Sequence, residues 1–215
     1  SLHDNIKCGN SLIGWDVMTP GMPADEIKRI NPFDWDTEFA DIVKAGGFDA
    51  VIGNPPYVRQ EGLKEQKKYF ETRYAVYQGT ADLYAYFIEK GINLLRPKGL
   101  FSYIVANKWM RANYGKPLRK FLLTKQIEEI VDFGDLPVFK TATTYPCIIR
   151  VSQEKSTHEF CAANVEALDF ASLNDYVKGH WHHIDPKTLN EDGWTLGDQG
   201  TECLIKKLQE VGISL

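Results

Sequence analysis

Long apolar runs are missing from this sequence. None reaches the roughly 18 residues that indicate a membrane-spanning helix, and the first residues lack the basic and apolar regions of a signal peptide. The four cysteines show no CxxC spacing and are too scattered to indicate a zinc site. We therefore expect a cytoplasmic protein with no membrane span, no bound metal and reduced thiols.

An excess of positive charge is also missing, since the formal net charge is −4. This argues against a protein that coats nucleic acid, although a local basic edge is still compatible with nucleic-acid binding. Basic residues gather in two stretches, namely Lys64, Lys67, Lys68 and Arg73, and then Lys108, Arg111, Lys116, Arg119, Lys120 and Lys125. For either stretch alone, a solvent-exposed helix face is the better interpretation. Because each stretch follows a predicted strand, the two together favour a basic surface along one rim of the sheet.

The segment 53–57, Gly-Asn-Pro-Pro-Tyr, is the most informative part of the chain. It directly follows the apolar run 48–52, and open α/β sheets bind their ligands where such strands end. The Asn54 amide offers donors and an acceptor, the two prolines fix the backbone, and Tyr57 offers a flat face with a polar tip. The segment is suited to hold a planar group that bears an amine, and a rigid turn is the structural alternative.

Hydrophobic periodicity predicts alternating strands and helices. Strands are expected at 48–53, 100–106, 127–133 and 146–151, helices at 81–95 and 115–125, and a long, partly helical loop at 58–80. This alternation is typical of an α/β sheet with helices on its faces. Only about a dozen residues without a helical pattern join the last two strands, so that pair is expected to be antiparallel. Residues 158–165 are a further candidate strand, and residues 200–212 have the pattern of a terminal helix.

The segment 48–59 resembles the catalytic motif of the amino-group DNA methyltransferases, written (D/N)PP(Y/F). Residues 82–109 are similar to the helix and strand that follow this motif in the family. Residues 134–150 are similar to a later motif whose aromatic residue packs on the target base. Segments 5–13 and 30–34 resemble those that precede the motif in large fused restriction–modification enzymes. The ordered set is most similar to the N6-adenine branch, in the Eco57I-like family of type II and IIG enzymes.

The resemblance covers roughly residues 3–152 and implies a fold. That fold is the C-terminal half of a Rossmann-like, S-adenosylmethionine-dependent methyltransferase sheet, of class α/β with an antiparallel last strand. Residues 1–152 are then the catalytic part of this domain, and residues 153–215 an extension leading toward a target-recognition domain. The resemblance implies S-adenosylmethionine as cofactor. The partners that it implies are double-stranded DNA and the rest of the protein's own chain.

The same resemblance implies a role for each residue of the motif. A flipped adenine lies at the end of the first strand, where the Asn54 side-chain oxygen and the Pro55 carbonyl accept hydrogen bonds from its amine. Pro56 keeps the carbonyls aimed at that position. Tyr57 stacks on one face of the base, and Phe139 holds a second face or edge. An ordinary place in the core is the structural alternative for either ring.

Four further residues are candidates for binding. Asn10 is a candidate contact to the adenine of the cofactor, although a turn or cap role is at least as compatible with its sequence context. Arg59, Lys108 and Arg111 are candidate contacts to the DNA backbone, because basic side chains near strand ends suit phosphate groups.

One feature of the resembling family is missing. The family binds its cofactor through a Gly-x-Gly turn after its first strand, whereas no two of the 17 glycines here are separated by a single residue. No counterpart of the acidic residue that ends the family's second strand is found either. We therefore expect an internal piece of a larger enzyme, inactive by itself. The alternatives are an NPPY methyltransferase of RNA or protein glutamine, and a non-catalytic module that binds DNA or a partner.

Overall fold

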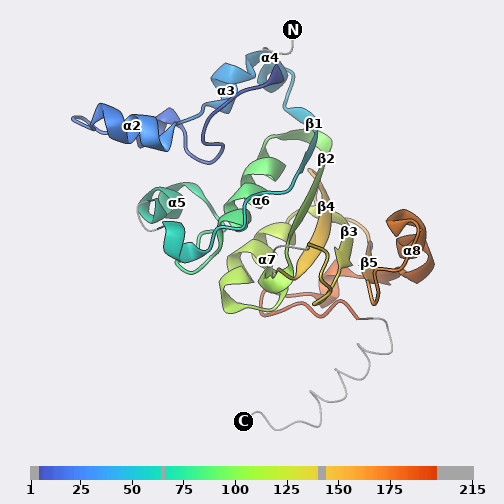
Figure 1. The fold of residues 1–215 in the computed structure, drawn as a ribbon. Coiled ribbons are helices and arrows are strands. Elements are labelled where there is room, and N and C mark those ends of the chain that lie inside the picture. The colour runs from blue at the N-terminus through green and yellow to red at the C-terminus, as the bar shows by residue number, and fades with distance from the viewer. Residues whose placement is uncertain (1–4, 64–65, 140–143, 198–215) are drawn as a thin grey trace.

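The computed structural model describes residues 5–63, 66–139 and 144–197, and its centre is one six-stranded sheet (Figure 1). The strands are β1 (Phe48–Gly53), β2 (Leu95–Ala106), β3 (Gln126–Asp132), β4 (Pro146–Ser152), β5 (Phe160–Asn164) and β6 (His182–Ile184). Their spatial order is β1-β2-β4-β3-β5-β6. The pairs β1–β2 and β3–β5 are parallel, and β4 is antiparallel to both of its neighbours. The predicted α/β sheet with an antiparallel β4 is therefore confirmed.

Helices and short 3-10 turns connect these strands. The helices are α2 (Ala24–Ile30), α3 (Trp35–Glu38), α4 (Ala40–Lys44), α5 (Lys67–Arg73), α6 (Leu83–Asn93), α7 (Lys116–Leu122) and α8 (Leu173–His180). The 3-10 turns are η1 (Trp15–Val17), η2 (Gln60–Leu63), η3 (Asn107–Met110), η4 (Asn113–Gly115) and η5 (Pro186–Thr188). The predicted helices 81–95 and 115–125 are α6 and α7, and the candidate strand 158–165 is β5. The predicted terminal helix 200–212 lies outside the described residues.

One face of the sheet packs against α6 and α7. Alternate residues of β2 and β4 point to this face and are fully buried there, among them Phe101 and Ile149. Helix α6 approaches β2 so closely that a Cβ atom on Gly91 would lie 2.7 Å from the Phe101 ring. Glycine at position 91 is therefore required by the packing between this helix and the sheet.

The opposite face is covered on one side only. A second cluster of buried side chains includes Val131 of β3, Ala163 of β5 and Val177 of α8. Figure 1 shows α8 beside β5. On β1 and β2 the same face is open to solvent. Ala50 pairs with Leu100 in the register of β1 and β2, and Ile52 lies two residues further along this face. Ile52 is 86% exposed and Leu100 is 43% exposed.

The N-terminal segment 5–47 reaches the sheet through an aromatic cluster at the start of β1. Trp35 stacks on Phe39 with a centroid distance of 5.6 Å, and both rings make edge contacts with Phe48, at 5.9 and 5.4 Å. Figure 1 shows α2, α3 and α4 grouped at this end of the molecule, away from α8. The cluster fixes where β1 enters the sheet.

Two observations concern the described chain as a whole. No helix within the described ranges is both long enough and apolar enough to cross a membrane. The described cysteines, Cys8, Cys147 and Cys161, are free, and burial raises the pKa of the Cys147 thiol.

The sheet continues beyond residue 152 through β5 and β6. The division of the chain at residue 152 stays a prediction.

Candidate active site

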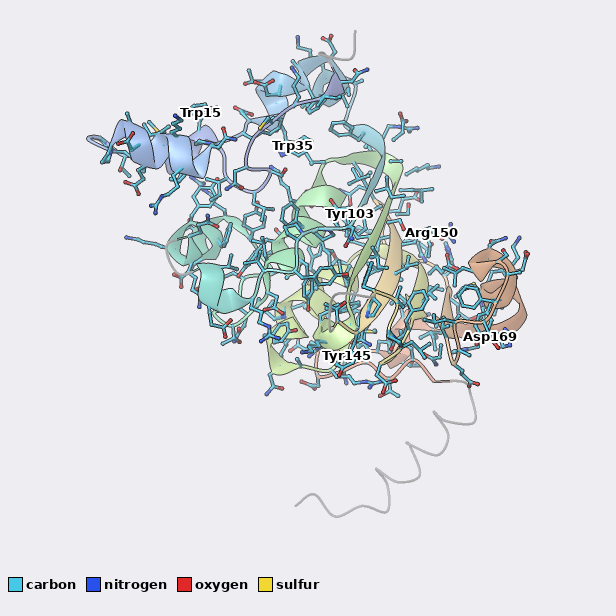
Figure 2. All side chains as sticks on the ribbon, viewed as in Figure 1. Trp15, Trp35, Tyr103, Tyr145, Arg150 and Asp169 are labelled. Carbon is cyan, nitrogen blue, oxygen red and sulfur yellow. The ribbon has the colours of Figure 1, made fainter. Side chains whose placement is uncertain are left out.

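The strands β1, β2 and β3 all end at one edge of the sheet, where β4 begins. Ala106 at the end of β2 pairs with Pro146, and Asp132 at the end of β3 pairs with Cys147. Because β1 is parallel to β2, Gly53 ends at the same edge. We call this edge the carboxyl rim. Figure 2 shows Tyr145 at this lower end of the sheet, and Trp35 lies toward the opposite end.

The segment Asn54–Tyr57 leaves β1 at the carboxyl rim and leads toward α6. Asn54 is exposed and Pro55 is buried. The Val58 amide donates to the Pro56 carbonyl at 2.9 Å, and the Leu83 amide at the start of α6 donates to the Val58 carbonyl at 3.0 Å. These bonds hold the backbone of the segment, so the Asn54 amide is presented to solvent from a fixed position.

Tyr57 and Phe139 come together at this edge although they are far apart in the sequence. Their ring centroids are 6.2 Å apart, and the rings meet edge to face at 66°. The Tyr57 hydroxyl is buried and has no hydrogen-bond partner among the described residues. Burial raises the pKa of Tyr57, and the nearby Cys147 thiol adds to this increase. The hydroxyl therefore points into the protein, while the ring remains half-buried beside Phe139.

Basic side chains also lie at the carboxyl rim. Lys108 and Arg111 are both exposed, and with Asn107 and Asp132 they line a small cavity of about 250 Å³. The Lys108 ammonium lies 5.9 Å from the centroid of the Tyr145 ring, within the range of a cation–π contact. These groups give this part of the rim a cationic and aromatic surface. Arg59 is also exposed, two residues beyond Tyr57.

Sequence reasoning missed a polar network at the same edge. One carboxylate oxygen of Asp132 accepts from the Asn107 side-chain amide at 2.8 Å and from the Gly134 backbone N–H at 3.0 Å. The Asn107 amide also donates to the Gly134 carbonyl at 3.2 Å. The available signal was that Asn107 and Asp132 each lie at the end of a predicted strand, which is where α/β sheets place functional side chains.

Asn10 has the geometry of a turn residue. Its side-chain oxygen accepts from the Leu12 N–H at 3.1 Å, and its own N–H donates to the Asn31 carbonyl at 2.7 Å. These bonds lie within the N-terminal segment. The turn role that the sequence left open is therefore present, and a contact between Asn10 and a cofactor stays a prediction.

The described part of the chain holds no group of three His, Cys, Asp or Glu side chains arranged to bind a metal ion. The chemistry available at the carboxyl rim is instead that of an exposed amide, backbone carbonyls, two aromatic rings and exposed cations. Through hydrogen bonds, ring contacts and positive charge, such a set can orient a planar, amine-bearing group and attract anions.

Comparison with known proteins gives consistent results. A family model described as "Eco57I restriction-modification methylase" matches residues 1–139. The chain is 29% identical over 218 residues to the type II restriction enzyme and methyltransferase RM.Eco57I of Escherichia coli, a match that covers 98% of this chain and 20% of that protein. It is 37% identical over 199 residues to the type II methyltransferase M.BstVI of Geobacillus stearothermophilus, with 81% of this chain and 34% of that protein covered. The chain thus spans about a third or less of these relatives.

Solved structures share the fold at low identity. The type ISP restriction–modification enzyme LlaBIII, described as ATP-dependent and bound to DNA, superposes with a TM-score of 0.55 at 15% identity, over 89% of this chain and 15% of that chain. The type IIG restriction endonuclease BpuSI gives a TM-score of 0.53 at 14% identity, over 78% of this chain and 23% of that chain. The prediction of a methyltransferase-like α/β sheet is confirmed.

Proposed function

Since a family model matches well over half of it, the chain belongs to the Eco57I restriction-modification methylase family, and from this premise we propose that it is the catalytic region of a site-specific DNA methyltransferase. The target that we propose is the N6 amine of an adenine flipped out of the duplex, and the methyl donor is S-adenosylmethionine. The observation that carries this proposal is the meeting of Asn54–Tyr57 with Phe139 at one edge of the sheet.

Asn54 and Pro55 supply the acceptors for this chemistry. The amine of adenine is a weak nucleophile, because its lone pair is delocalised into the ring. Two oxygens that accept its two hydrogens favour a pyramidal nitrogen whose lone pair is free to form the new bond to carbon. The Asn54 amide is not a base, so its contribution is orientation and stabilisation of the developing positive charge. The surplus proton leaves the amine after the methyl group has been transferred.

Tyr57 and Phe139 are proposed to hold the base itself. Stacking of a base on an aromatic ring contributes about 1–3 kcal/mol, which offsets part of the cost of flipping. Lys108, Arg111 and Arg59 would neutralise phosphates beside the flipped nucleotide. Two rings at a rim that also carries exposed cations suit a nucleotide better than a glutamine side chain. They therefore favour a nucleic-acid substrate over a protein one.

We infer that the described residues supply at most part of a cofactor site. The Gly-x-Gly turn is absent from the sequence, and the Asn10 side-chain oxygen serves a local turn by accepting from the Leu12 N–H. We therefore propose that the site is completed by another part of the same protein. Parallel strands are normally covered on both faces, whereas Ala50, Ile52 and Leu100 form an open apolar face beside the outer edge of β1. This open face and edge are the proposed docking position for the cofactor-binding part.

Methyl transfer by the full-length protein tests the function. Transfer of a tritiated methyl group to duplex DNA should fall by about 10²–10³-fold or more in Asn54→Ala, as when one transition-state hydrogen-bond partner is removed. Asn174→Ala, an exposed asparagine on α8, is the matched control and should leave the rate unchanged. Chromatography of the hydrolysed DNA should yield N6-methyladenine. Full activity of Asn54→Ala, or a label found on cytosine, would contradict the proposal.

Calorimetry tests the incomplete cofactor site. The 215-residue chain should show no binding of S-adenosylmethionine at micromolar concentrations, whereas the full-length protein should bind it. Micromolar binding by the isolated chain would show that these residues suffice, and the docking proposal would then be wrong.

A further inference from the structure

The side chain of Asp132 takes no part in the backbone pairing of the strands. Its backbone carbonyl accepts from the Val165 N–H at 2.8 Å, so the main chain of β3 is bonded to the chain leaving β5. Its carboxylate instead points to the carboxyl rim, where the residue is only 7% exposed. A carboxylate at this depth is destabilising unless hydrogen bonds compensate for lost solvation. The two donors that it has are therefore of special interest.

These two donors come from different segments. Asn107 directly follows β2 and directly precedes Lys108, while Gly134 opens the turn that leads to Phe139. The Asn107 N–H also donates to the Tyr145 carbonyl at 2.7 Å, just before β4. A single carboxylate thus links the ends of β2 and β3, and through Asn107 it also reaches the start of β4.

The turn from Gly134 to Phe139 transmits this anchoring to the ring. Gly134 has a φ of +56°, a conformation that glycine adopts without strain. The Leu136 N–H donates to the Phe133 carbonyl at 3.0 Å, and the Val138 N–H donates to the Leu136 carbonyl at 2.9 Å. Leu136 and Val138 pack against the second core cluster. Because these hydrogen bonds and contacts restrain the turn, we infer that the position of Phe139 depends on how Gly134 is held.

We propose that Asp132 is a positioning residue that fixes the base-stacking ring of Phe139 and the phosphate-binding side chain of Lys108 relative to each other. Asp132 itself touches neither base nor phosphate and acts through Gly134 and Asn107. The inference rests on the proposed function, since it assumes that a nucleotide binds at the carboxyl rim. Its consequence is that base and phosphate are held as one unit, so a defect at Asp132 weakens both contacts at once.

The experiment uses the full-length protein and the variants Asp132→Ala, Asp132→Asn and Asn107→Ala, with Asp135→Ala as the control. Asp135 is exposed in the same turn. The methylated position is first mapped by sequencing plasmid DNA that the enzyme has modified. Two readouts then follow on a duplex with 2-aminopurine at that position, namely its fluorescence and the salt dependence of binding. Steady-state constants for DNA and for S-adenosylmethionine are measured alongside.

Asp132→Ala should combine the defects of Lys108→Ala and Phe139→Ala. We expect roughly tenfold or greater loss in kcat/KM for DNA, with the KM for S-adenosylmethionine unchanged. The slope of log K against log salt should fall by about 0.9, equivalent to one lost phosphate contact. The 2-aminopurine signal should fall as in Phe139→Ala. Asp132→Asn keeps an acceptor oxygen, so its kcat/KM, salt slope and fluorescence should lie close to those of the wild type. Asn107→Ala should show at least the reduced salt slope.

Three outcomes would overturn the inference. The first is steady-state constants of Asp132→Ala that match those of the wild type. The second is an equal loss of DNA binding and S-adenosylmethionine binding in Asp132→Ala. The third is an Asp132→Asn variant that is as defective as Asp132→Ala. If Asp132→Ala does not fold, Asp132→Asn and Asn107→Ala supply the same readouts, and normal values in both would contradict it. Asn54→Ala separates the two proposals, because its full activity removes the function itself. An inactive Asn54→Ala beside a normal Asp132→Ala removes only the positioning role.

Discussion

Two parts of the same sheet face differ in what covers them. On β3 and β5, Val131 and Ala163 are buried beneath α8 and its neighbours. On β1 and β2, Ile52 and Leu100 point to the same face and remain exposed. Strand β1 has an apolar sequence like that of a central strand, yet it lies at the edge. Burial is therefore set by the neighbours of a strand as well as by its own sequence.

The difference also divides the carboxyl rim. On the side of β2, β3 and β4, hydrogen bonds from Asn107, Asp132 and Gly134 hold the edge together. On the outer side of β1, the backbone of the strand faces no partner within the described sheet. The part of the rim proposed to hold the substrate is thus fixed by hydrogen bonds. The part proposed to meet the cofactor-binding region has no strand partner within the described sheet.

Ile149→Ala in the 215-residue chain should have the largest effect. Ile149 is fully buried on β4, so we expect a loss of about 2–5 kcal/mol in the free energy of unfolding, from lost burial and the cavity left behind. Urea denaturation followed by circular dichroism measures it. Ile52→Ala makes the same chemical change at the exposed site and should cost less than about 0.5 kcal/mol. Ile149 lies on the face that packs against α6 and α7, so similar losses in both variants would show that Ile52 is covered as well.

Arg119→Met should destabilise the packing of α7 against its neighbours. The Arg119 side chain is 1% exposed and donates to the backbone carbonyls of Trp109, Ala112 and Glu191. Methionine keeps much of the volume but leaves buried acceptors unpaired, at a cost of about 1–3 kcal/mol.

The thermal midpoint of the 215-residue chain checks the Arg119 prediction. Lys28→Met, at an exposed position on α2, is the control. A midpoint in Arg119→Met equal to that of the control would show that these hydrogen bonds add nothing.

Ile52→Ser tests the open face in two proteins, the 215-residue chain and the full-length protein. In the 215-residue chain the side chain is already exposed, so the midpoint should not move. In the full-length protein, where the face is proposed to be covered, losing a buried isoleucine should cost about 1.5–3 kcal/mol. Denaturation of both proteins tests this. An equal response in the two contexts would mean that nothing covers β1.

Asp49→Asn should have the smallest effect. Asp49 pairs with Arg96 at 2.5 Å, and the two side chains are 83% and 47% exposed. Exposed ion pairs contribute about 0–1 kcal/mol and are screened by salt. We expect a change of a few tenths of a kcal/mol at low salt that disappears at about 1 M salt. A larger, salt-independent loss of stability would show that the Asp49–Arg96 pair is shielded from solvent.

Local sequence was sufficient for the elements and for part of the site. The end of β1 at Gly53, the segment Asn54–Tyr57 and the antiparallel β4 follow from apolar runs, prolines and connection lengths. The sequence did not reveal that β4 lies between β2 and β3, because the order of strands depends on pairing between distant segments. Asn107 and Asp132 meet only because of that order, so their network was not predicted.

Strand boundaries were predicted less well, for a local reason. Residues 96–99, Arg-Pro-Lys-Gly, have the composition of a helix stop, and the second strand was expected to begin at Leu100. In the structure β2 begins at Leu95, which pairs with Phe48 ahead of a register shift. A bulge of this kind hides part of a strand from periodicity, because the alternation of side chains is interrupted.

The buried hydroxyl of Tyr57 has a consequence for how this position evolves. Without a hydrogen-bond partner among the described residues, the oxygen adds nothing that phenylalanine would lose. Phenylalanine at position 57 would keep the ring that contacts Phe139. Because tyrosine and phenylalanine codons differ by a single nucleotide, one base change is enough to make this exchange.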